Sequence, residues 1–188
     1  MKPDANMIRQ LFPEIEIIEN KELAEKIIAV WIKAYSQAKA GARLADIPFF
    51  NKIPKISLVQ HIRKVILVAK ALINVIETDP DAPPVDKDVL FAACFLHDVD
   101  KVLLQEPTSD GLGWQPSKVS RWYPHGYLGA MLCSEAGLPE VVVHLVATHS
   151  NDAPIPPEPY EGILLHYADY FAADTAFWRA GLPPLFRH

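Results

Sequence analysis

The chain has 188 residues, of which 50% are hydrophobic and 22% are charged, and its formal net charge is −5 at pH 7. This length fits one compact domain, and the apolar fraction excludes a wholly disordered chain. The negative charge argues against long nucleic acid as a partner, because a basic surface supplies most of that affinity. No apolar run reaches the length of about 18 residues that a membrane helix needs. We therefore expect a cytoplasmic protein with no membrane partner.

Proline-rich breaks separate segments whose apolar residues recur at helical spacing. The predicted helices run from Asn20 to about Ala40, from Ser57 to about Glu77, from Val89 to about His97 behind an Asp86 cap, from Pro124 to Glu135 or Ala136, from Pro139 to Thr148–Ser150, and from about Tyr160 to Ala180. Gly41 is expected to end the first of them, and Ser57-Leu-Val-Gln60 has the capping-box form that begins the second. Strand signals are weak, so the sequence predicts an all-α domain. Cys94 and Cys133 lie in apolar helical patterns and are expected to be buried free thiols.

Several of these helices place a histidine or an aspartate on their apolar side. His97 and Asp98 follow six apolar residues near the end of a predicted buried helix. Two ionisable groups are costly there unless they are paired or bind a metal. His61, His149 and Asp169 share faces with the apolar residues of their own helices. A single histidine of this kind is more often a hydrogen-bonded core residue, but several together indicate a metal centre in the core of a bundle.

In chain order these residues form a series that resembles the HD superfamily of metal-dependent phosphohydrolases. The series is His61, His97-Asp98, His125, His149 and Asp169. The similarity covers about residues 57–175, and the segment HDVDK resembles the HD-x-x-K form of the family. The resemblance implies an HD-domain helical bundle over residues 57–188, with residues 1–56 as additional N-terminal helices packed on the core.

Carried over residue by residue, the resemblance also implies a site. One metal would be held by His61, His97, Asp98 and Asp169, and Asp98 would bridge to a second metal held by His125 and His149. The cofactor is thus expected to be two divalent transition-metal ions, Fe, Mn, Co or Zn. Asp98 and Lys101 are the expected catalytic residues, because Lys101 would contact a substrate phosphate or the bridging water. A solvated surface lysine is the alternative for Lys101.

The sequence departs from the family pattern at two positions beside these ligands. Ser150 follows His149, where many relatives with two metals carry a second His or a Glu, so the detailed coordination of the second metal stays open. Asp100 replaces a common glycine, and we expect it to be solvated rather than an outer contact of the site. His144 and His166 are left out of the predicted ligand set.

Two Pro- and Gly-rich connectors, residues 104–123 and 150–159, border the predicted ligands and are long enough to be binding loops. The first connector carries Lys118 and Arg121 as candidate contacts for a substrate phosphate. Lys64 is a third candidate, because on the helix that carries His61 it lies closer to the site than Arg63 does.

The implied activity is hydrolysis of a phosphate ester or anhydride by a metal-activated water. The substrate would be a nucleotide or another small phosphorylated metabolite. A mixed-valent di-iron oxygenase that acts on a small (phosphorylated) metabolite uses the same ligand set and is the alternative, and a non-catalytic sensor pocket is a third. A homo-oligomer is left open.

Overall fold

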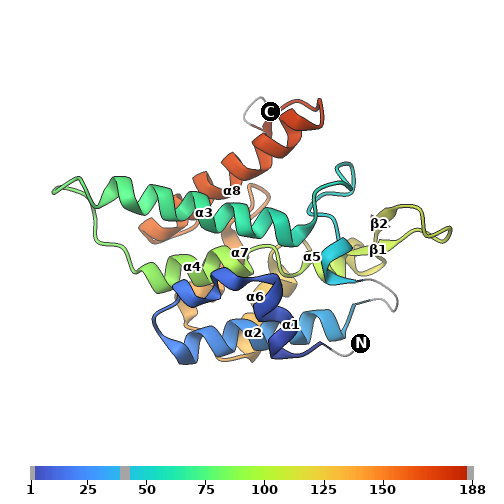
Figure 1. Cartoon of the computed structure of the whole chain (residues 1–188), viewed down its shortest axis with the longest axis horizontal. Coiled ribbons are helices and arrows are strands. Elements are labelled where there is room, and N and C mark those ends of the chain that lie inside the picture. Colours follow the sequence, from blue (N-terminus) through green and yellow to red (C-terminus); the bar gives the residue numbers. More distant parts are fainter. Residues whose placement is uncertain (1–2, 39–42, 186–188) are drawn as a thin grey trace.

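The computed structural model describes residues 3–38 and 43–185, and its architecture is a helical bundle (Figure 1). The helices are α1 (Ala5–Leu11), α2 (Lys21–Ser36), α3 (Leu58–Ile76), α4 (Lys87–Leu96), α5 (Lys101–Leu104), α6 (Tyr127–Glu135), α7 (Glu140–Thr148) and α8 (Tyr160–Arg179). Short 3₁₀ turns lie at Pro13–Ile17, Leu44–Asp46 and Val119–Arg121. The all-α fold class is confirmed. None of the helices in the described ranges is long and apolar enough to cross a membrane.

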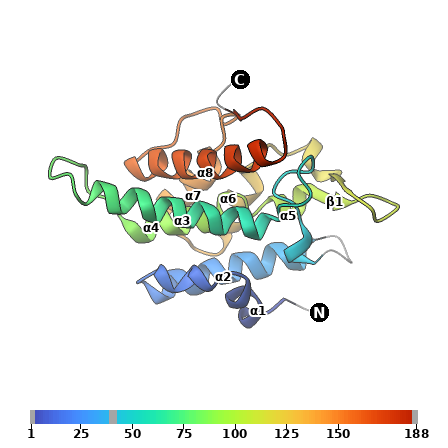
Figure 2. The same cartoon turned by 45° about the horizontal axis from the view of Figure 1, so that its top comes forward.

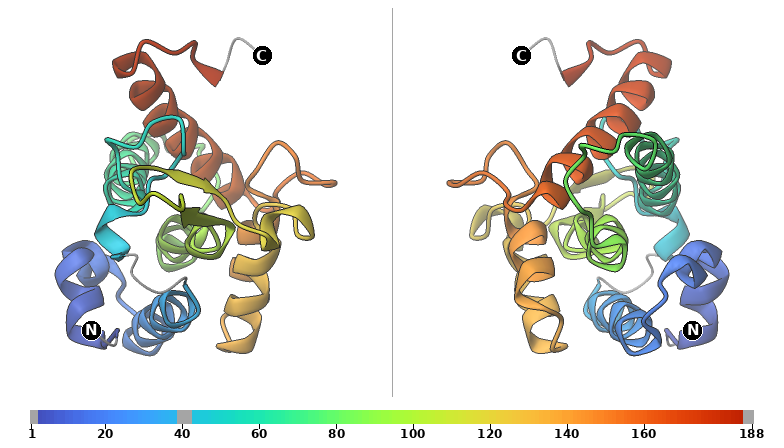
Figure 3. Two further views of the ribbon diagram at one scale, coloured as in Figure 1. Left: turned by 90° about the vertical axis from the view of Figure 1, so that its right-hand side faces the viewer. Right: turned by 90° about the vertical axis from the view of Figure 1, so that its left-hand side faces the viewer.

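Helix α4 lies at the centre of the bundle, packed against α2, α3, α7 and α8 (Figure 3). Every residue from Val89 to Leu96 is buried, as expected of a helix that is apolar on all sides. The chain therefore leaves α4 inside the molecule, and His97 and Asp98 follow directly there. Cys94 in this helix and Cys133 in α6 are buried free thiols, as predicted.

Helices α3 and α8 lie side by side on one side of α4, with α1 and α2 on the opposite side (Figure 2). Helix α3 begins with the predicted capping box: the Ser57 hydroxyl accepts from the Gln60 N–H, and the Gln60 side chain accepts from the Ser57 N–H. His61 lies in the first turns of α3, and Asp169 lies in the middle of α8. The packing of the two helices brings these two side chains together.

The N-terminal helices share one apolar core with the rest of the described chain. Trp31 of α2 is fully buried and donates its indole N–H to the carbonyl of Phe95, 3.2 Å away. The carboxylate of Asp88, in the first turn of α4, accepts from the backbone N–H groups of Glu19 and Asn20, each at 2.8 Å. The division of the chain into an extension and an HD domain stays a prediction.

Helix α2 ends at Ser36, before the predicted end at Ala40. The Ser36 hydroxyl donates to the carbonyl of Lys33, a local bond that competes with the helical pattern. Ala40 and Gly41 themselves lie outside the described residues.

The sequence predicted that helix α6 begins at Pro124, but in the structure it begins at Tyr127. Gly126 precedes the helix with φ +87°, a left-handed conformation that an L side chain rarely adopts. Its N–H donates to the carboxylate of Asp100, so a tertiary contact holds the turn and delays the start of the helix.

The connector over residues 104–123 contains a hairpin that the sequence did not predict. Strands β1 (Gln105–Pro107) and β2 (Trp114–Pro116) pair antiparallel, with Glu106 opposite Gln115. Each strand has only three residues and carries a proline, so its sequence has little strand propensity. The hairpin forms because the two segments pair with each other, and a local sequence pattern does not reveal such pairing.

Candidate metal centre

The six predicted ligands converge at the C-terminal end of α4. They form two groups whose candidate ligand atoms lie within 4.8 Å of one another: His61, His97 and Asp169 in the first, and Asp98, His125 and His149 in the second. They come from α3, the end of α4, the turn before α6, the end of α7, and α8. Segments far apart in the sequence thus supply one cluster.

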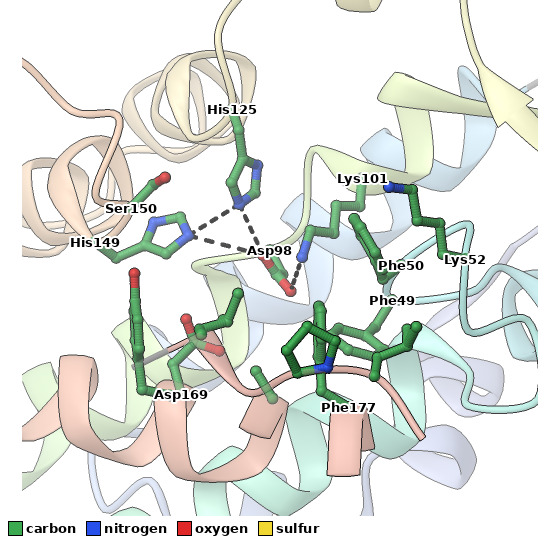
Figure 4. A pocket seen from close by; sticks show the side chains of 15 residues that line it. Phe49, Phe50, Lys52, Asp98, Lys101, His125, His149, Ser150, Asp169 and Phe177 are labelled. Carbon is green, nitrogen blue, oxygen red and sulfur yellow. Dashed lines mark hydrogen bonds and ion pairs between the residues drawn. The ribbon is translucent and has the colours of Figure 1, made fainter. Parts of the chain in front are cut away.

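The carboxylate of Asp98 lies between the two groups and faces each with a different oxygen. Figure 4 shows this carboxylate beside His125, His149 and Lys101. Its Oδ2 lies 3.3 Å from Nε2 of His61 and 3.5 Å from Nε2 of His97. Its Oδ1 lies 2.9 Å from Nε2 of His125 and 3.7 Å from Nε2 of His149. A carboxylate in this position can bridge two cations.

Two of the histidines have a fixed orientation. The Nδ1 atoms of His97 and His149 lie 2.9 Å and 2.8 Å from the backbone carbonyls of Cys94 and Val146. Because a carbonyl only accepts, each Nδ1 carries a hydrogen, and in the neutral ring each Nε2 presents its lone pair to the cluster. Histidine ligands of metals are commonly oriented by a partner of this kind.

His125 is oriented by Asp100, which the sequence analysis placed in solvent; that interpretation is wrong. Asp100 is fully buried. Its Oδ1 lies 2.9 Å from Nδ1 of His125, and its Oδ2 accepts from the N–H of Gly126 at 2.6 Å. A buried carboxylate needs such partners, and here they are a predicted ligand and the turn that carries it.

The charges around the cluster shift its pKa values. Burial opposes the charged form of His125, but the neighbouring carboxylates, Asp100 foremost, raise the pKa of this imidazole to about 9. Burial likewise opposes ionisation of Asp98, yet Lys101 and the adjacent histidines hold the pKa of this carboxyl well below its usual range. Burial lowers the pKa of His149. Asp98 is therefore an anion at neutral pH, as a metal ligand requires.

The donor set fits divalent metal ions. Nε2 of His125 lies 3.0 Å from Nε2 of His149, and Nε2 of His61 lies 3.4 Å from Nε2 of His97. Two ring nitrogens at these distances need a proton or a metal ion between them, because two facing lone pairs would repel. Imidazole nitrogens combined with carboxylate oxygens suit Zn, Mn, Fe or Co.

A cavity of about 590 Å³ opens onto the cluster, a volume typical of small-molecule sites. Four of the six ligands line it, namely Asp98, His125, His149 and Asp169. Lys101 lines it too, with its Nζ 2.7 Å from Oδ2 of Asp98 and its side chain 21% exposed. Lys101 thus lies beside the ligands, where the resemblance placed it.

The other predicted substrate contacts do not line this cavity. Lys64 borders a separate hollow with Lys55 and Arg179. Lys118 and Arg121 are exposed, and Nζ of Lys118 lies 5.4 Å from the centre of the Trp122 ring. Their role as phosphate contacts stays a prediction.

The cavity also has lining residues that the sequence analysis did not single out for it, among them Lys52 and Tyr170. Lys52 lies in an irregular connector without hydrophobic periodicity, so no local pattern could have indicated it. His144 and His166 lie outside both ligand groups: Nε2 of His144 accepts from the N–H of Glu158, and the ring of His166 packs on that of Tyr170.

A protein-family model described as HD domain matches residues 58–174. The matched range begins with the first residue of α3, ends within α8, and contains the six ligands and Lys101. No curated protein and no solved structure gives a significant match to the chain.

Proposed function

The chain belongs to the HD domain family, and from this premise we propose that it is a metal-dependent phosphohydrolase acting on a nucleotide or another small phosphorylated metabolite. The observation that carries this proposal is the position of Asp98, whose two oxygens face two groups of ligand atoms beside an open cavity. A centre of two cations that share one carboxylate suits phosphoryl transfer to water.

The chain's own residues supply the binding and orientation. His61, His97 and Asp169 would hold one ion, His125 and His149 the other, and Asp98 both. When bound, divalent ions lower the pKa of a water and neutralise charge on phosphoryl oxygens. Lys101 adds a cation at the cavity wall, where its ammonium group can donate to a phosphoryl oxygen of the substrate. In the reaction a water oxygen bonds to phosphorus, the bond to the leaving oxygen breaks, and that oxygen gains a proton.

The first test is the metal content of protein purified without added metal or chelator. We expect about two equivalents of transition metal, falling toward one in His125→Ala and in His149→Ala, because each removes a ligand of the second ion. His144→Ala is the matched control, since this histidine lies outside both ligand groups. One equivalent that neither ligand variant changes would leave a mononuclear site. Protein that takes up no Mn, Fe, Co or Zn would exclude the proposal.

The second test is the reaction itself. We expect the metal-loaded protein to release phosphate from small phosphate esters and the chelated protein to release none. Lys101→Met should lower kcat/KM by about 10- to 100-fold, the size expected for losing one hydrogen bond to a charged group. Native iron together with substrate-dependent oxygen uptake, and no phosphate release, would instead favour the di-iron oxygenase.

A further inference from the structure

The cavity over the metal centre has an apolar half to which the proposed hydrolysis assigns no role. Its apolar lining consists of Phe49, Phe50, Ala173, Phe177, Leu182, Pro183 and Leu185. These residues come from the loop before α3 and from the C-terminal part of α8 with the segment that follows it. The predicted ligands at the other end are all histidines and aspartates, so the cavity changes from charged to apolar along its length (Figure 4).

Three aromatic rings give the apolar half a defined shape. The rings of Phe50 and Phe177 are stacked, with centroids 5.3 Å apart and planes 29° from parallel. The ring of Phe49 packs edge-on to Phe177 at 6.3 Å and stacks on the imidazole of His61 at 4.6 Å. Because Phe49 contacts both a predicted ligand and this aromatic wall, the wall is directly continuous with the metal centre.

Two lysines lie beside the aromatic rings, and one of them, Lys101, also contacts a predicted ligand. Nζ of Lys101 is 5.4 Å from the centre of the Phe49 ring while it pairs with Asp98, and Nζ of Lys52 is 6.0 Å from the centre of the Phe50 ring. Both lysines line the cavity. An anionic group fits beside Lys101 and the predicted ligands, and an apolar group fits the wall beyond them.

We propose that the substrate is a phosphomonoester of an apolar alcohol or phenol about as large as one or two fused rings. Its phosphate lies at the metal end, and its apolar group packs against Phe50 and Phe177. This inference rests on the proposed hydrolysis and narrows its substrate to non-nucleotide esters, because the wall side chains of Phe50, Ala173 and Phe177 offer no hydrogen-bonding group to the polar edges of a nucleobase. Cleavage of the P–O bond by water gives the alcohol and inorganic phosphate.

Substrate preference tests the proposal in the metal-loaded protein. We expect kcat/KM for 1-naphthyl phosphate to exceed that for glycerol 3-phosphate and for AMP by at least about tenfold, the effect of burying one apolar ring. A preference for AMP or for glycerol 3-phosphate would overturn it.

Binding separates this inference from the hydrolase proposal, since it needs no turnover. Calorimetry on the Mn-loaded protein should show phenylphosphonate binding about tenfold more tightly than methylphosphonate. Equal affinities would overturn the apolar subsite even if phosphate esters are cleaved. Tighter phenylphosphonate binding without any cleavage would support the subsite and count against the hydrolase alone.

Variants locate the effect on the wall. Phe177→Ala should abolish the preference for phenylphosphonate and leave methylphosphonate binding unchanged, and Phe50→Ala repeats the test from the loop should the first variant not fold. Trp178→Ala is the matched control, because this neighbouring ring on α8 is 72% exposed and does not line the cavity. A preference that survives in both folded variants, or that is lost in Trp178→Ala, would contradict the assignment.

Discussion

At the scale of single residues, Asp100 connects the candidate metal centre to the backbone around it. One of its oxygens accepts from the ring of His125 and the other from the N–H of Gly126. It thereby fixes both the orientation of a predicted ligand and the turn that carries this ligand. Partners of this kind commonly change metal affinity by about 10- to 100-fold when they are removed.

We therefore expect Asp100→Ala to lose the ion that His125 and His149 hold, measured as metal content and as the dissociation constant for Mn. Asp100→Asn should have an intermediate effect, because the amide keeps an acceptor oxygen at one of the two positions and puts an NH2 donor at the other. Asp81→Ala, which removes an exposed carboxylate in the loop after α3, is the control. Normal metal content in Asp100→Ala would show that His125 needs no such support.

Gly126 is constrained in two ways, by its backbone angle and by its surroundings. Its φ is +87°, and a Cβ there would lie 2.8 Å from the carbonyl oxygen of Val146. Gly111, in the β1–β2 turn, has φ +70° but nothing within 4 Å of such a Cβ.

Gly111→Ala should therefore cost about 1 kcal/mol, from backbone strain alone. Gly126→Ala should cost at least about 2 kcal/mol more, because the backbone of α7 cannot move aside. Urea unfolding of the two variants measures the difference, and equal costs would show that the overlap at Gly126 relaxes freely.

At the scale of elements, the start of α3 determines where His61 lies. The capping box satisfies N–H groups that the first turn would otherwise leave unpaired, and the N–H of His61 itself donates to the carbonyl of Ser57. Ser57→Ala should lower the free energy of unfolding by about 1 kcal/mol. Ser57→Asp keeps a capping acceptor, so its free energy of unfolding should stay close to that of the parent protein. Equal stability of Ser57→Ala and the parent protein in urea would show that tertiary packing alone holds this turn.

At the scale of the whole molecule, the N-terminal segment contributes to the same core as the helices that carry the ligands. Trp31 is fully buried, its indole N–H donates to the carbonyl of Phe95 near the end of α4, and its ring lies 4.9 Å from that of Phe12. Truncating one large buried aromatic side chain of this kind to alanine lowers the free energy of unfolding by about 3 to 5 kcal/mol.

The fragment 57–188 should therefore unfold without a cooperative thermal transition and should lack the near-ultraviolet circular dichroism of the full chain. Trp31→Phe in the full chain is a milder change. We expect this variant to keep a cooperative thermal transition with a lower midpoint temperature. A fragment that melts cooperatively and binds metal would show that residues 1–56 are an independent addition and not part of one folding unit.

Much of this arrangement could be predicted because the signals are local. Helical spacing of apolar residues indicated α3, α4, α7 and α8 to within a few residues, and the Ser57–Gln60 pattern gave the start of α3. The ligand series could be recognised because its members occur in a characteristic order, with His97 and Asp98 adjacent in the chain. The amino-acid sequence by itself therefore determined the helical class, the family and the candidate ligands.

Other features depended on tertiary structure, because they join segments that are distant in sequence. Packing decided that Asp98 faces two ligand groups and that Asp100 is buried against His125. It also decided that the aromatic wall forms where the loop before α3 meets the end of α8. No periodicity reveals whether an isolated carboxylate is solvated or paired, since its burial depends on what the rest of the fold places around it.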